Sequence, residues 1–194
     1  KDGGTIQVGI GALGDAIVSG LIMRNEHNDI YREVAEKAGL TTRYGELINK
    51  LGGTDRFKKG LYGSSEMFVD AFMQMYKSGI LKRKVYHSIP LMKLINNGEL
   101  SEDRTPEDII DKLLKMKAVH SKLNQDDFCF LQKYGILKDG VTFNGSEIKD
   151  GDERYSTDLG DPSNLMKIRK ITCKKLKGGE VICGAFYFGP QSFY

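Results

Sequence analysis

The segment Glu180–Phe188 limits the fold of this chain more than any other. Its sequence, EVICGAFYF, is too uniformly apolar for a half-exposed strand with alternating faces. A run of this kind predicts a strand buried on both faces, as in parallel sheets. A second β-type run, Thr5–Val8, ends in glycines and is followed by helical spacing of apolar residues. The alternation of strands and helices predicts an α/β fold, a largely parallel open sheet flanked by helices.

Apolar spacing predicts four helices in the first part of the chain, over residues 15–23, 30–38, 44–51 and 67–76. Gly39 and the pair Gly52-Gly53 follow the second and third of these, as expected for residues after a helix C-terminus. Gly60-Leu61-Tyr62-Gly63 has the composition of a buried strand tip before the fourth helix.

The middle of the chain differs in character and predicts a helical insertion over residues 89–137. Thr105-Pro106-Glu107-Asp108 is typical of a helix start, and a second helix is predicted over residues 126–134. Beyond the insertion, Asn144-Gly145 predicts a hairpin turn, and Asp161-Pro162 predicts the start of a helix that runs to Leu176. The predicted domains are therefore an α/β domain of residues 1–88 and 138–194, and the insertion.

Composition excludes several classes of protein. The net charge is +3, no long Lys/Arg tract is present, and no stretch has the ~18 apolar residues of a membrane span, so neither nucleic acid nor a membrane is an expected partner. Three cysteines without metal-ligand spacing predict core thiols, no metal site and a reducing cytoplasmic compartment. The chain begins at Lys1 and stops after an apolar run, so we expect it to be part of a longer protein.

The first candidate site is the glycine loop, Gly9-Ile10-Gly11-Ala12-Leu13-Gly14. It matches G-x-G-x-x-G between a strand and a helix, where backbone N–H groups hold phosphates in dinucleotide-binding proteins. A nicotinamide site also needs a strand ending in Asp or Glu about 20 residues on, and that region has a helical pattern. Phosphate or CoA binding, nicotinamide binding and a tight turn without a ligand all stay open on this evidence.

The second candidate is Glu66, within Gly60–Asp70, where a strand gives way to a helix. Open α/β sheets bind ligands at such crevices. The local pattern by itself favours a structural role, in which Ser64 or Ser65 caps the helix and the carboxylate lies in its first turn.

Three separated motifs together resemble the C-terminal half of the acetyl-CoA hydrolase/transferase family of CoA-transferases. They are IQVGIGALGDAIVSGL, GLYGSSEMFVDAF and GAFYFGPQSFY, in the family's order, and DLGDPSNLMKI is similar to long-form members. Shorter relatives place the loop and the Glu closer together than here. The resemblance implies a CoA-transferase-like fold, with Glu66 as covalent nucleophile and Gly9, Ile10, Gly11, Ala12 and Leu13 in contact with CoA.

The implied function is that of an acyl-CoA:carboxylate CoA-transferase or an acetyl-CoA hydrolase. Its substrates would be acyl-CoA and a carboxylate or water, with coenzyme A as the only cofactor-like group. The N-terminal half of the same protein would complete the site, so the fragment alone is expected to be inactive, and homo-oligomerisation is left open. A nicotinamide-dependent oxidoreductase using Gly9–Gly14 and a non-catalytic CoA-binding domain are the alternatives.

Overall fold

The computed structural model of this chain describes residues 1–187. It has two compact units, one of residues 1–85 with the segment that begins at Glu180, and one of residues 86–179. Residues 138–179, which we expected in the α/β domain, lie in the second unit with the predicted insertion. The physical reason is a shared hydrophobic core, to which both Leu113 and Ile168 belong.

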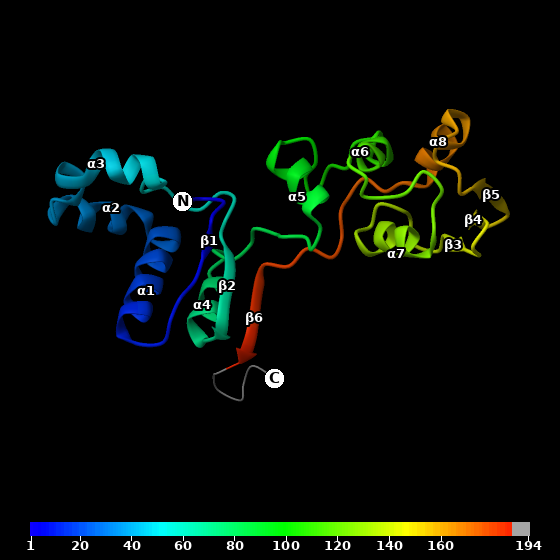
Figure 1. The fold of residues 1–194 in the computed structure, drawn as a ribbon. Coiled ribbons are helices and arrows are strands. Elements are labelled where there is room, and N and C mark those ends of the chain that lie inside the picture. Colours follow the sequence, from blue (N-terminus) through cyan, green and yellow to red (C-terminus); the bar gives the residue numbers. More distant parts are fainter. Residues whose placement is uncertain (188–194) are drawn as a thin grey trace. The chain divides into compact units, whose positions relative to one another are not determined.

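The first unit contains a three-stranded parallel sheet. Its strands are β1 (Thr5–Ile6), β2 (Tyr62–Phe68) and β6 (Ile182–Tyr187), in the order β1-β2-β6. Thr5 is opposite Tyr62, and Gly63 is opposite Ile182. Figure 1 shows β2 and β6 side by side, with helix α4 (Asp70–Lys77) beside β2. A mixed α/β fold with a small parallel sheet flanked by helices is thus confirmed.

The expectation that β6 is buried on both faces is wrong for its described residues. Cys183 and Phe186 are exposed, because β6 pairs only with β2 within residues 1–187 and forms an edge of the sheet. Phe188, the last residue of the predicted strand, and residues 188–194 of the third motif lie outside the described residues. Cys129 is also exposed, so the prediction of core thiols is wrong for two of the three cysteines.

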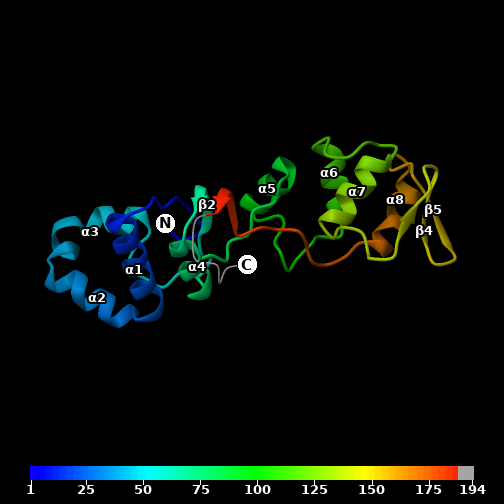
Figure 2. The same ribbon diagram turned by 90° about the horizontal axis from the view of Figure 1, so that it is seen from below.

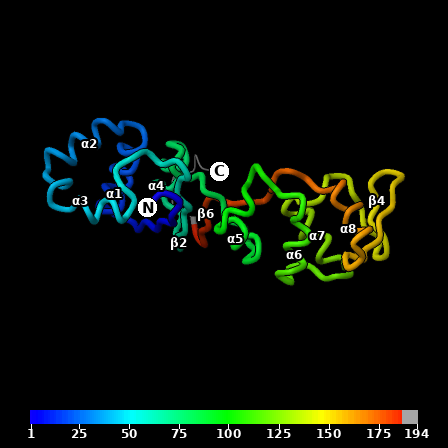
Figure 3. The backbone as a smooth tube through the Cα atoms, turned by 90° about the horizontal axis from the view of Figure 1, so that it is seen from above, coloured from blue at the N-terminus to red at the C-terminus, as the bar shows by residue number. Residues whose placement is uncertain are grey.

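Three helices follow β1 and form the outer part of the first unit. They are α1 (Ala12–Glu26), α2 (Asn28–Lys37) and α3 (Leu40–Leu51). All three were predicted, over shorter ranges, and Figure 3 traces them in turn. Gly39, between α2 and α3, has φ 68°, a left-handed conformation that glycine adopts without steric cost.

The start of α4 differs from the prediction. Met67 and Phe68 belong to β2, where they pair with Phe186 and Tyr187, and the helix begins at Asp70. Apolar spacing over residues 67–76 suits a helix, but pairing with a strand more than 100 residues away decides the conformation of the first two. Phe72 and Met75 of α4 are fully buried against Val18 of α1 and Leu61.

The second unit combines short helices with a small antiparallel sheet (Figure 2). Its helices are α5 (Ile89–Asn96), α6 (Ile109–Lys115), α7 (Gln125–Lys133), α8 (Pro162–Ile168) and the 3-10 turn Arg169–Ile171. Its strands are β3 (Thr142–Phe143), β4 (Glu147–Asp150) and β5 (Glu153–Ser156), in chain order. The hairpin predicted at Asn144-Gly145 is confirmed by the pairing of Phe143 with Ile148.

Two helix boundaries in this unit were predicted wrongly. The N-cap of α6 is Asp108 rather than Thr105, whose main-chain N–H instead donates to the carbonyl of Lys174. Helix α8 begins after Asp161 as predicted, and the Asp161 carboxylate accepts from the Ser163 N–H. It ends at Ile168 rather than Leu176, because Cys173 and Leu176 form main-chain hydrogen bonds with Ile136 and Glu102.

Within residues 1–187, no helix has the length and hydrophobicity needed to span a membrane.

Tyr86 is one of three residues with a buried side-chain polar atom that has no hydrogen-bond partner in the described part of the chain. Its ring is buried against Tyr134, and its hydroxyl has no hydrogen-bond partner among residues 1–187. Burial, followed by the carboxylates of Glu102 and Asp103, raises the pKa of this hydroxyl to about 12. A buried hydroxyl without a partner loses its hydration and gains nothing in exchange.

We therefore expect Tyr86→Phe to raise the free energy of unfolding by about 1 kcal/mol at pH 7. The folded pKa lies above the unfolded value of about 10, so the wild-type chain should lose stability as the pH rises from 10 towards 12, a loss that the variant should largely escape. Urea unfolding at pH 7 and pH 11 measures both effects. The matched control is Tyr155→Phe: the Tyr155 hydroxyl donates to Glu153, so its removal should destabilise the chain. Destabilisation by both substitutions would contradict the prediction.

Candidate functional site

The carboxyl ends of β1 and β2 lie at the same edge of the sheet, because the two strands are parallel neighbours. The glycine loop follows β1, and the first turn of α4 follows β2. Together they line one pocket of about 220 Å³, formed by Gly9, Ile10, Gly11 and Asp15 on one side and Val69, Asp70 and Ala71 on the other. The structure thus joins the two sequence motifs, which are separated by the intervening helices α2 and α3.

Of the predicted loop residues, Gly9, Ile10 and Gly11 line this pocket. Ala12 and Leu13 form the first turn of α1 and do not, although both are exposed. A Cβ on Gly9 or Gly11 would meet no atom of residues 1–187 within 4 Å, so these residues leave the space beside the two glycines open. Gly11, the N-cap of α1, has φ 116°, which L side chains rarely adopt. The loop therefore needs glycine there for its own conformation as well.

Gly14 has a different role from the other two glycines of the motif. A Cβ at this position would collide with the carbonyl oxygen of Gly9 and lie 3.0 Å from Cγ1 of Val8. Val8 is buried in the core of the first unit. Gly14 therefore allows the first turn of α1 to pack directly against the chain that leaves β1. Packing within the protein, rather than a ligand, requires glycine at this position.

Glu66 lies in β2, the middle strand of the sheet, between the pairs Ser65–Gly184 and Met67–Phe186. The alternative that it belongs to the first turn of a helix is wrong: the N-cap of α4 is Val69, and neither Ser64 nor Ser65 caps the helix. The Glu66 side chain is exposed, with no hydrogen bond or ion pair among residues 1–187. It does not line the pocket described above, although its strand leads into it.

Ser65 shapes the main chain beside Glu66. Its Oγ donates to the carbonyl oxygen of Met67 at 2.7 Å and lies 3.3 Å from the Met67 main-chain nitrogen. These contacts join the residues on either side of Glu66. The half-buried Ser65 therefore holds the strand in place while Glu66 itself remains accessible.

Two acidic residues of the pocket, Asp15 and Asp70, were not predicted as site residues. Each lies in the first turn of a helix, where a carboxylate is favoured by the helix dipole. Their positions after two β-type segments were visible in the sequence. Two carboxylates beside the loop would repel a pyrophosphate bound there, so the pocket favours an uncharged part of a ligand.

We find no group of three or more His, Cys, Asp or Glu side chains positioned to hold a metal ion in the described part of the chain. A scan against protein-family models, a search of curated proteins and a search of solved structures each returned no match. The function is therefore inferred from the geometry at the carboxyl ends of β1 and β2 and from the sequence motifs located there.

Proposed function

We propose that this chain carries the catalytic carboxylate of an acyl-CoA:carboxylate CoA-transferase or an acyl-CoA hydrolase, with Glu66 as the nucleophile. The observation that carries the proposal is the placement of Glu66. It is an exposed carboxylate without a structural partner among residues 1–187, on the middle strand of a parallel sheet in which the glycine loop follows the neighbouring strand β1. The class of reaction is inferred from the resemblance of the three sequence motifs to those of CoA-transferases.

The chemistry consists of two acyl exchanges at one carboxylate. Glu66 attacks the thioester carbonyl of acyl-CoA, forming an acyl-glutamyl anhydride and expelling the CoA thiolate. The thiolate then attacks the glutamyl carbonyl, which forms a glutamyl-CoA thioester and releases the acyl group as a carboxylate. An acceptor carboxylate repeats these steps in reverse to give the new acyl-CoA, whereas water would hydrolyse the thioester to free CoA and Glu66.

Backbone N–H groups of the glycine loop would have to stabilise the oxyanion that develops in each exchange against the negative charge of Asp15 and Asp70. Such stabilisation is effective in a site from which water is excluded. Glu66 is exposed, so the bound CoA and a further part of the protein would have to cover it. The resemblance implies that an N-terminal half of the same protein does so, and tests of activity therefore need the longest natural chain that contains residues 1–194.

The nicotinamide alternative is less well supported by the structure. Helix α2 occupies the region where a dinucleotide-binding fold has its second strand, so Asp29 and Glu33 are helical residues rather than strand ends. Asp15 and Asp70 also place negative charge where a pyrophosphate would bind.

The test is mass spectrometry of the protein after acyl-CoA is added without an acceptor. We expect a thioester adduct, with the mass of CoA less one water, on the tryptic peptide of residues 60–77. This peptide contains only two carboxylate side chains, Glu66 and Asp70, so fragmentation assigns the adduct and Asp70→Asn is the matched control. An adduct on Asp70, or none at all, would contradict the proposal. Binding of CoA without any adduct would favour the non-catalytic alternative.

A further inference from the structure

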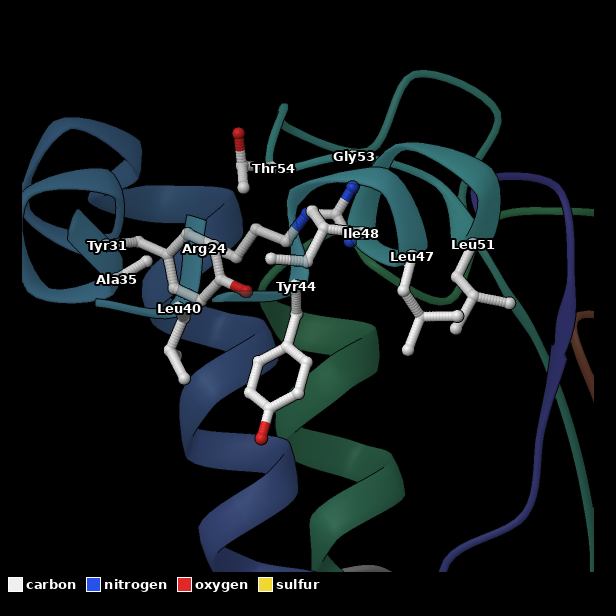
Figure 4. Close-up of a pocket in the computed structure, with 10 residues that line it drawn as sticks. All are labelled: Arg24, Tyr31, Ala35, Leu40, Tyr44, Leu47, Ile48, Leu51, Gly53 and Thr54. Atoms are coloured by element: carbon white, nitrogen blue, oxygen red, sulfur yellow. The ribbon is translucent and has the colours of Figure 1, made fainter. Parts of the chain in front are cut away.

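A second and larger pocket lies at the other end of α1, and the proposed reaction does not use it. Its volume is about 470 Å³, within the range of small-molecule sites. Figure 4 shows the lining residues, contributed by all three outer helices and the turn after α3: Arg24, Tyr31, Ala35, Leu40, Tyr44, Leu47, Ile48, Leu51, Gly53 and Thr54. Arg24 is in the last turn of α1, so about 18 Å of helix separates this pocket from the glycine loop.

The apolar wall of the pocket comes mainly from α3. Helix α3 has a kink at Tyr44, where the backbone is not helical, and it contributes Leu40, Tyr44, Leu47 and Leu51 to the wall. Figure 4 shows the four side chains pointing the same way. Each is between 42% and 58% exposed, and α3 has no buried residue. Exposed apolar surface of this kind usually marks a binding site.

One cation lies within this apolar lining. Arg24 is only 8% exposed, and its guanidinium is 4.4 Å from the ring centroid of Phe57. Its Nε donates to the carbonyl of Asp55 at 2.7 Å, and Nη2 donates to that of Gly52 at 3.0 Å. These contacts hold the guanidinium in place and use two of its five N–H groups.

No carboxylate of the described residues neutralises the charge of Arg24. Among residues 1–187 it forms no ion pair and Nη1 has no acceptor, while the nearby Asp55 carboxylate pairs with Arg32 instead. A buried charge is costly unless an opposite charge or hydrogen bonds compensate it. An anion that reached Nη1 would find a donor already held in position by the protein.

We propose that this pocket binds a small amphipathic monoanion, an aliphatic carboxylate whose chain lies along the apolar face of α3 and whose head group meets Arg24. The apolar wall accounts for the body of such a ligand, and the guanidinium, which has no carboxylate partner among residues 1–187, accounts for its charge. The volume suits a medium-length chain rather than a whole cofactor. This site does not involve Glu66, so the failure of either proposal would leave the other unaffected.

The test compares two probes of equal length, octanoate and octan-1-ol, titrated calorimetrically into the protein. We expect octanoate to bind at least tenfold more tightly, because only the carboxylate can pair with Arg24. Arg24→Gln should abolish this difference. Equal affinity of the two probes for the wild-type protein, or no binding of either, would overturn the proposal.

A second pair of variants covers the case in which Arg24→Gln fails to fold. Leu47→Glu places a carboxylate on the pocket wall at a position 52% exposed, so it should weaken octanoate binding at least tenfold without unfolding the chain. Val34→Glu makes the same charge change on α2, at an equally exposed position outside the lining, and should leave binding unchanged. Equal weakening by both variants would contradict the proposal. If Leu47→Glu instead separated a dimer into monomers and octanoate did not bind, the pocket would be an interface between copies and the proposal would fail.

Discussion

Replacement of Glu66 by Gln should reduce acyl transfer or hydrolysis by at least about a thousandfold while leaving the protein folded. An amide nitrogen or oxygen does not form the anhydride, so both exchanges stop at the first step. The side chain is exposed and has no partner among residues 1–187, so we expect its substitution to change the free energy of unfolding by less than about 0.5 kcal/mol. The measurements are the rate of CoA exchange at saturating acyl-CoA and the midpoint of urea unfolding.

Asp70→Asn is the control for charge alone. It removes one negative charge from the same edge of the sheet and sits at an exposed position in the first turn of α4. If the loss of activity came from the local electrostatic field, the two variants would behave alike. Normal turnover by Glu66→Gln, with deamidation back to Glu excluded by mass, would refute the assignment of the nucleophile.

The second large effect is expected at Gly14. Gly14→Ala should lower the free energy of unfolding by about 1–3 kcal/mol, the usual cost of overpacking, because its Cβ would collide with the Gly9 carbonyl oxygen. To relieve that contact, α1 and the glycine loop have to separate, so binding of acyl-CoA should weaken as well. Urea unfolding gives the first quantity, and calorimetric titration with acyl-CoA gives the second.

Gly20→Ala is a matched control in the same helix. Gly20 lies inside α1, and a Cβ there would meet no atom of residues 1–187 within 4 Å. Alanine is the better helix former, so this variant should gain about 0.5–1 kcal/mol. If Gly14→Ala were as stable as Gly20→Ala, the close approach of α1 to the loop would not be a constraint on the fold.

Local sequence patterns were not sufficient to predict the secondary structure around Glu66. The local pattern favours a helix over residues 67–76, and with it a capping role for the acid before it. The structure extends β2 through Phe68, because the partner residues Phe186 and Tyr187 of β6 are available to pair with it. Local spacing carries no information about a strand so distant in the chain, so the environment of Glu66 was not predictable from its neighbours.

What the sequence alone determined about this chain is its local structure. The glycines that follow α2 and α3, the hairpin at Asn144-Gly145 and the Asp161-Pro162 helix start were predicted correctly, because each depends on the conformational preference of a few adjacent residues. Asn144 does not have the positive φ of a type I′ turn, so the type of the turn differs from the one that Asn-Gly favours. The parallel pairing of β1 and β2 was predicted only as a class of fold.

Tertiary structure decided the rest. It grouped residues 138–179 with the predicted insertion, exposed β6, ended α8 early and brought Asp15 and Asp70 to the pocket beside the glycine loop. It also placed Arg24 in an apolar pocket, where no carboxylate of residues 1–187 pairs with it. These features depend on which distant segments pack together, and the gain from burying apolar surface is not directional, so a pattern along the chain does not specify its partner.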